Sequence, residues 1–137
     1  LQKIILPHGG LVTDWGANDG FTGSFQYTTA LDRSWIHTDG WNTWAAVCYL
    51  TPNAPVSSGT GLYRRKSTGL MTGEKDEQLE NGEPQDKTKW ELVDTVGNVF
   101  NRLVMYRGDL WHVSQDYFGN SKENGRLFQL FFISTEY

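Results

Sequence analysis

The stretch Trp44-Ala45-Ala46-Val47-Cys48-Tyr49-Leu50 is an uninterrupted apolar run, closed by the turn residues Thr51-Pro52-Asn53. It has the length of a strand, and it lacks the polar alternation that a half-exposed strand shows. The run therefore predicts a strand that is buried on both faces and lies at the centre of a β fold.

Short segments with β-favouring composition lie on both sides of this run, separated by turns. The 15 glycines and the 14% aromatic content also favour pleated strands joined by many turns. About eight short strands fit a sandwich or jelly roll better than a helical or βαβ fold. We expect an all-β protein, with strands or extended segments at 2–6, 21–29, 34–40, 44–50, 59–65, 100–106, 110–114 and 126–134.

One segment departs from this composition. Residues 67–89 are dominated by Gly, Glu, Lys, Asp and Gln, with few apolar side chains. Such a segment predicts a polar loop insertion in the β fold, with room for a short helix. It is either a solvated excursion or a lid over a site.

The bulk properties restrict the function. A chain of 137 residues indicates one domain, covering 1–137. The net charge of -4 gives no basic field, so nucleic-acid binding is not indicated. The single cysteine, Cys48, excludes an intramolecular disulfide, and no apolar run reaches the ~20 residues that span a membrane. We expect a cytoplasmic protein; the start at Leu1, without methionine, leaves room for a missing N-terminal portion.

A histidine and a carboxylate lie two residues apart, at His37 and Asp39. On an extended backbone, alternate side chains emerge on the same side. A second histidine, His112, lies in the predicted strand 110–114 and can close a site from there. Two histidines and one carboxylate form the facial triad of non-haem Fe(II) oxygenases, and the absence of further thiolates suits the same metal. The alternative is a surface histidine that binds only its neighbour.

Arg126 opens the last predicted strand and is followed by apolar residues. Its guanidinium is therefore expected near or inside the mouth of the β structure, where a buried charge needs a partner. A carboxylate of a ligand would suit its planar fork. A salt bridge to an acidic side chain is the alternative.

The order of these residues resembles the Fe(II)- and 2-oxoglutarate-dependent oxygenases: His-x-Asp, a distal His, then an Arg at the head of the last strand. The stretches 100–106 and 125–132 look like the prolyl-4-hydroxylase-like branch or its uncharacterised bacterial relatives. The resemblance implies a double-stranded β-helix, a cupin-like jelly roll. It also implies Fe(II) on His37, Asp39 and His112.

The same resemblance assigns the cosubstrate. Arg126 would pair with the distal carboxylate of 2-oxoglutarate. Many members have a serine two residues after this arginine, but Phe128 stands there. Tyr27 or Tyr49 could supply the hydroxyl instead; the alternative is that both are core aromatics. Asp116 is considered as an acceptor for His112. The implied reaction uses O2 to convert 2-oxoglutarate to succinate and CO2 while a substrate is hydroxylated.

Two other functions stay open from the sequence. One is a cupin-like jelly roll that uses the triad without 2-oxoglutarate, and the other is a non-catalytic binding module. Trp41, Trp44 and Trp111 are expected to be packing residues, although one of them could wall the substrate pocket. The sequence indicates neither the substrate nor the oligomeric state.

Overall fold

The expected apolar strand is β3 (Trp44–Tyr49), which lies between β8 (Arg126–Glu136) and β6 (Leu103–Arg107) in an antiparallel sheet. The computed structural model describes residues 1–8, 10–16, 20–74 and 77–136. Four of the six β3 residues are buried, on both faces, as the sequence predicts. Within the described ranges, no helix combines the length and apolar character that crossing a membrane requires.

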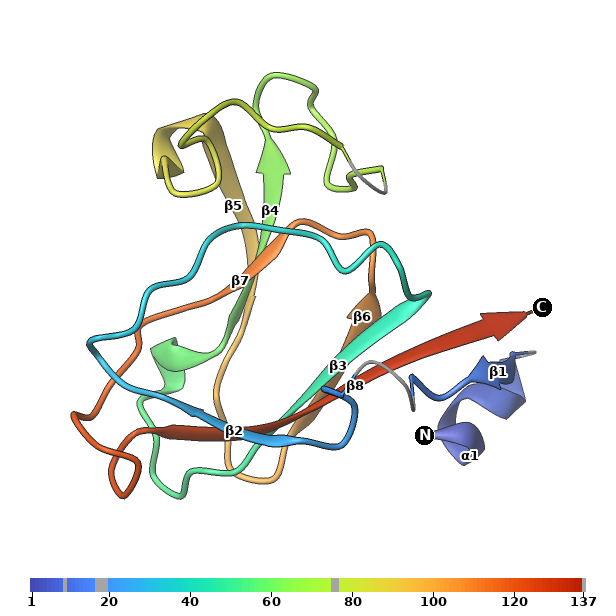
Figure 1. The fold of residues 1–137 in the computed structure, drawn as a ribbon, viewed down its shortest axis with the longest axis horizontal. Helices are drawn as coiled ribbons and strands as arrows, with labels where there is room; N and C mark the ends of the chain where they lie inside the picture. The colour runs from blue at the N-terminus through green and yellow to red at the C-terminus, as the bar shows by residue number, and fades with distance from the viewer. Residues whose placement is uncertain (9, 17–19, 75–76, 137) are drawn as a thin grey trace.

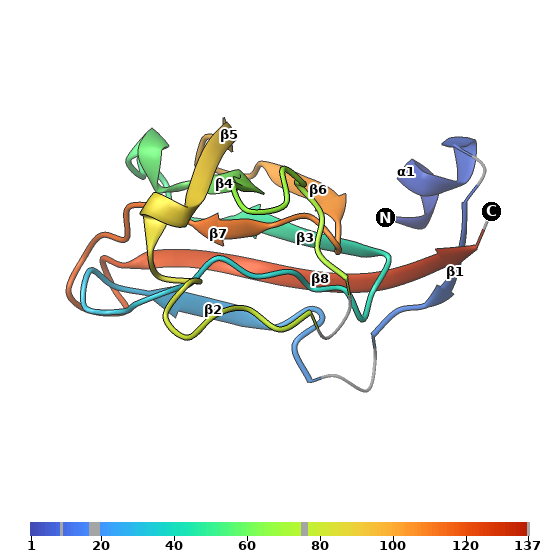
Figure 2. The same cartoon turned by 90° about the horizontal axis from the view of Figure 1, so that it is seen from above.

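β8 is the longest strand and joins most of the five-stranded sheet (Figures 1 and 2). Its first residues pair with β2 (Phe25–Thr28), and its last residues pair with β1 (Leu11–Asp14). The other edge of β8 pairs with β3 along six residues. The strand order is β1-β8-β3-β6, with β2 also on β8.

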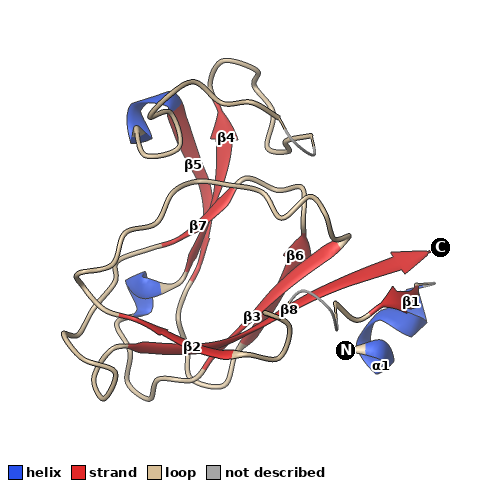
Figure 3. Ribbon diagram, viewed as in Figure 1, coloured by secondary structure: helices blue, strands red, loops and turns tan. Residues whose placement is uncertain are grey.

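A second antiparallel sheet has three strands in the order β5-β4-β7 (Figure 3). They are β4 (Thr60–Arg65), β5 (Trp90–Val96) and β7 (His112–Ser114). The fold is therefore all-β at the level of its sheets, as the sequence predicts. The edge strand β5 is not among the predicted strands; it is mostly exposed.

The strand register separates an inner from an outer face of the larger sheet. Opposed residues of antiparallel strands share a face. Thr28 opposes Arg126, and Tyr49 opposes Phe128, so these side chains lie on one face. The Tyr49 hydroxyl is 2.7 Å from Thr60 Oγ1 on β4, which shows that this inner face looks towards the second sheet.

The structure contains two buried clusters, one on the inner face and one on the opposite face of the second sheet. One consists of Val47, Tyr49 and Phe128, with Val104 and Leu130 packed against it. The other covers the second sheet and consists of Ile36, Tyr63, Trp90, Trp111 and Val113.

The N-terminal segment differs from the expected strand over 2–6. It forms the short helix α1 (Gln2–Ile5), followed by a 3-10 turn at Leu6–His8. The amides of Ile4 and Ile5 donate to the carbonyl of Leu1. The nearby edge of β8 already pairs with β1, so local hydrogen bonds satisfy this backbone instead.

The polar insertion is anchored to the second sheet through Arg65 at the end of β4. Its guanidinium forms two hydrogen bonds of 2.7 Å with Glu83 and one of 2.6 Å with Glu77. Glu83 is buried, and its hydrogen bonds to Arg65 lower the pKa of its carboxyl. The insertion includes a 3-10 helix at Lys87–Lys89, and the carbonyl of Pro84 accepts a hydrogen bond from Ile36 beside the predicted site.

Arg65→Ala is expected to lower the free energy of unfolding by about 3–5 kcal/mol, because it leaves the buried carboxylate of Glu83 without its partner. The neighbouring Arg64→Ala is the matched control, because Arg64 makes an exposed ion pair with Glu91. Such a pair contributes about 0–1 kcal/mol. Urea denaturation of both variants measures the difference, and equal losses would contradict the anchoring role.

Candidate metal centre

His37 and His112 are held opposite each other by their own backbones. The amide of His37 donates to the carbonyl of His112 over 3.1 Å, and the amide of His112 donates back over 3.0 Å. This pair is an isolated antiparallel bridge that joins β7 to the loop before β3. Directly opposed residues place their side chains on one face. The two imidazole rings accordingly lie 4.4 Å apart between centroids.

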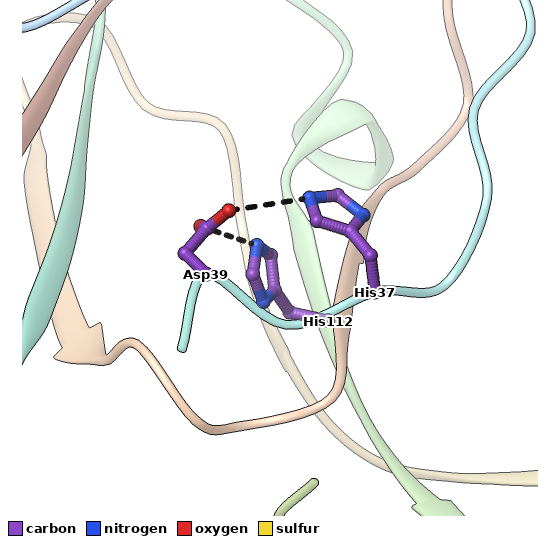
Figure 4. A group of neighbouring side chains, drawn as sticks. All are labelled: His37, Asp39 and His112. Carbon is purple, nitrogen blue, oxygen red and sulfur yellow. Dashed lines mark ion pairs between the residues drawn. The ribbon is translucent and has the colours of Figure 1, made fainter. Parts of the chain in front are cut away.

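Asp39 completes the group two residues after His37 (Figure 4). Its amide donates to the carbonyl of Gly108 over 2.6 Å, which draws the loop towards the turn after β6. A side chain on Gly108 would meet the Asn42 carbonyl oxygen at 2.3 Å, so only glycine fits there. The Asp39 carboxylate lies 3.2 Å from His112 Nε2 and 3.8 Å from His37 Nε2. All three potential ligand atoms lie within 4.8 Å of one another.

The tautomers of both histidines suit metal binding. His37 Nδ1 lies 2.8 Å from the carbonyl oxygen of Trp35, and His112 Nδ1 lies 2.8 Å from that of Leu110. A carbonyl oxygen only accepts, so Nδ1 carries the proton in each ring. In the neutral rings, the unprotonated Nε2 atoms therefore face the carboxylate of Asp39. Carbonyls that orient ligating histidines in this way are usual in metal sites.

A cation between these atoms is the simplest solution to their electrostatics. Asp39 and His112 are 5% and 4% exposed. A buried carboxylate that faces two nitrogen lone pairs is unfavourable unless positive charge lies between them. Burial, and then the neighbouring His112, lower the pKa of His37, which favours the neutral, metal-binding form of that ring. The His-Asp-His group could therefore hold a metal ion.

The sequence suggests Asp116 as the acceptor of a hydrogen bond from the His112 ring, and this expectation is wrong. The Nδ1 partner of His112 is the backbone carbonyl of Leu110. Asp116 lies in the loop after β7 with a φ of 44°, where the chain turns away from the strand.

Arg126 lies fully buried on the inner face at the start of β8. Its Nε donates to the carbonyl of Ser58 over 3.0 Å. Neither terminal nitrogen has a hydrogen-bond partner among the described residues. The alternative of a salt bridge to an acidic side chain is not found in the described part of the chain. Burial accordingly lowers the pKa of Arg126.

Aromatic rings surround this guanidinium. Its Cζ lies 4.5 Å from the centroid of Phe128 and 5.4 Å from that of Tyr49. Phe128, at the position where the family resemblance expects serine, therefore contributes a ring face instead of a hydroxyl. Tyr49 is fully buried, and burial raises the pKa of its hydroxyl.

The two expected hydroxyl donors have different positions. The structure brings Tyr49 to Arg126, but Tyr27 opposes Leu127 on the outer face and is 52% exposed. Tyr27 is therefore not placed to support a ligand of Arg126. The reason is the two-residue period of β2: its neighbour Thr28 opposes Arg126, so Tyr27 points the other way.

A cavity of about 270 Å³ lies beside the triad and is lined by His37, Asp39 and His112. Phe128 lines it as well, and its ring contacts Arg126, which is not itself among the lining residues. Tyr106 on β6, which the sequence does not single out, also faces this space. Its ring lies 4.6 Å from that of His112, and burial, followed by the charge of Asp39, raises its pKa. Its register opposite Ala45 could not be read from the sequence.

Comparison with known proteins identifies a family. A family model described as a family of unknown function, DUF6445, matches residues 26–133, which include all three triad residues and Arg126. No curated protein and no solved structure matches the chain.

His112→Ala is expected to abolish binding of one divalent metal ion, because it removes a buried ligand that no other described side chain can replace. The control is His8→Ala, an exposed histidine outside the group. Anaerobic calorimetry with Fe(II) should show no binding for the first variant, a larger effect than the ~10–100-fold loss caused by changing a residue that only orients a ligand, and no loss for the second. Unchanged affinity in both variants would place the metal elsewhere.

Proposed function

The chain belongs to the DUF6445 family of unknown function, and we propose that it is an Fe(II)- and 2-oxoglutarate-dependent dioxygenase that hydroxylates its substrate. The observation that carries this proposal is a His-Asp-His group on the 270 Å³ cavity, together with a buried arginine that packs against Phe128, another residue of the cavity wall. The His-Asp-His group suits a metal ion with a chelating oxo acid, and Arg126 suits a carboxylate. 2-Oxoglutarate has both of these groups.

The guanidinium of Arg126 supports the cosubstrate. A buried cation with two unpartnered terminal nitrogens is costly in the free protein. A carboxylate would accept hydrogen bonds from both nitrogens and restore the lost solvation. In this assignment the distal carboxylate of 2-oxoglutarate would bind Arg126. The hydroxyl of Tyr49 would donate a hydrogen bond to the same carboxylate. The 2-oxo acid end reaches the metal ligands at the other end of the cavity.

The fold that we propose for this chemistry is the double-stranded β-helix, a cupin-like jelly roll. The two antiparallel sheets and the inward-facing cavity support it. The triad lies at one side of the cavity, on β7 and the loop before β3, while Arg126 opens β8.

The residues of the chain have distinct roles in this proposal. His37, Asp39 and His112 would hold Fe(II), leaving coordination positions for the cosubstrate and O2. Bound iron would supply O2 activation, with one oxygen atom entering succinate and the other entering the hydroxyl group of the product. The apolar walls formed by Val47, Phe128 and neighbouring side chains would exclude bulk water.

Arg126 separates this function from the alternatives. A cupin-like enzyme without 2-oxoglutarate has no need for an unpaired guanidinium at this depth. A non-catalytic binding module could use Arg126 alone, but it would have no need for a buried carboxylate between two neutral imidazoles. The dioxygenase uses both features.

The protein with Fe(II) and 2-oxoglutarate, kept free of O2, is expected to show a weak visible charge-transfer band. Arg126→Met should weaken 2-oxoglutarate binding at least ~100-fold and leave Fe(II) binding intact, since a charge-assisted bidentate pair contributes about 3 kcal/mol. The free variant should be as stable as the parent or more stable, because it loses an unpaired buried charge. Full iron occupancy without the band, or normal 2-oxoglutarate affinity in Arg126→Met, would refute the cosubstrate.

Tyr49→Phe is expected to weaken 2-oxoglutarate binding by about 5- to 10-fold, the effect of one hydrogen bond. Tyr27→Phe is the matched control, since it removes the same group from the outer face. Calorimetric titration of both variants with 2-oxoglutarate, in the presence of Fe(II) and without O2, compares them. A larger effect at Tyr27 would contradict the assignment of Tyr49.

A further inference from the structure

A second cavity, of about 260 Å³, opens on the other side of His37. Three tryptophans line it: Trp35, Trp41 and Trp111. Trp111 is buried and packs edge-to-face on Trp90, with ring centroids 5.0 Å apart. Trp35 and Trp41 are about half exposed, at 52% and 59%. The cavity therefore has one rigid aromatic wall and two aromatic rings at its solvent side.

Trp35 and Trp41 are not explained by packing alone. They also line a wider apolar cavity of about 500 Å³, together with His37 and Asp39. The two rings thus stand at the boundary of both spaces, next to the metal-binding group. Large aromatic rings left at the mouth of a cavity indicate ligand contact more than core packing.

Two carboxylates also line the smaller cavity, beside apolar residues such as Leu79 and Pro84. Glu74 and Glu77 line it, and both also line an adjoining acidic space with Asp109. Glu77 shares Arg65 with Glu83, so one guanidinium serves two carboxylates. Glu74 has no ion pair among the described residues. Among the described residues, the Glu74 carboxylate therefore has no cationic partner at this wall, and no lysine or arginine is among the described lining residues.

Aromatic faces and uncompensated carboxylates attract the same kind of ligand. The faces of tryptophan rings bind organic cations, best when the cation is partly desolvated. Carboxylates add Coulomb attraction and accept hydrogen bonds from ammonium or guanidinium groups. An anionic or phosphorylated group would be repelled by the same wall.

We propose that this cavity binds an organic cation, an ammonium or guanidinium group on an aliphatic arm, as part of the substrate. The role of this cation as substrate rests on the proposed dioxygenase function, whereas its binding does not. With the cation between Trp41 and Glu74, the arm would run past His37, which lines the cavity and has a side chain that is 34% exposed. The C–H bonds of the arm would then lie beside the metal-binding group. The source of the cation is either a free amine or a lysine or arginine side chain.

Binding of defined probes to the full chain tests this proposal. The probes are N-acetyl-lysine N-methylamide, its neutral counterpart N-acetyl-norleucine N-methylamide, and n-butylammonium. Tryptophan fluorescence and NMR titration follow binding with and without Fe(II) and 2-oxoglutarate, in the absence of O2. The lysine probe or butylammonium should bind about 10-fold more tightly than the norleucine probe, the effect of a cation–π contact with a carboxylate nearby.

Two variants and their controls locate the site. Trp41→Leu and Glu74→Gln should each weaken binding of the cation by about 5- to 10-fold. Trp15→Leu and Glu91→Gln remove an exposed tryptophan and an exposed carboxylate outside the cavity, and they should have no effect. Preference for the lysine probe over butylammonium would indicate a protein side chain, and the reverse would indicate a free amine.

The outcomes separate this inference from the dioxygenase proposal. If neither the lysine probe nor butylammonium binds more tightly than the norleucine probe, or if Trp41→Leu and Glu74→Gln have no effect, the cation site is overturned whatever the iron experiment shows. Specific cation binding without a charge-transfer band would support the cation site and refute the dioxygenase function.

Discussion

The backbone pairing of His37 with His112 is the interaction on which the rest of the site depends. Two hydrogen bonds between these residues place both rings on one face. Each Nδ1 then lies beside the backbone carbonyl two residues earlier in the sequence. Asp39 joins them because its amide is held by Gly108, whose missing side chain lets the two loops approach. The geometry of the three side chains therefore follows from main-chain contacts between segments far apart in the sequence.

Arg126 adds a second constraint of a different kind. It lies buried among aromatic rings with two terminal nitrogens unpartnered in the described structure. Such an arrangement destabilises the free protein and becomes favourable when an anion binds. The Tyr49 hydroxyl, bonded to Thr60 across the two sheets, stands beside it. Stability is thus lower at the place where the proposed cosubstrate would bind, as is common at functional sites.

The strands were predictable where composition is unambiguous. The apolar run at 44–50 became β3, the segments 59–65 and 110–114 contain β4 and β7, and 126–134 covers most of β8. The helix over Gln2–Ile5 and the strands β1 and β5 were not predicted. The deciding factor is which strand edge is free for pairing: β1 occupies the end of β8, and β4 offers an edge to β5. Neither is visible in a local pattern.

For the site, the sequence by itself determined the residue types: two imidazoles, a carboxylate and an arginine, in an order that resembles a known class of oxygenases. Only the tertiary structure decided which of them meet. The register of β2 against β8 turned Tyr27 outwards, while β3 carried Tyr49 to Arg126. The register of β6 against β3 brought Tyr106 to the site. The anchored insertion placed Glu74 and Glu77 on the cavity that Trp41 lines. Spacing along one chain describes which side chains share a strand face, but the pairing of distant strands decides which faces meet.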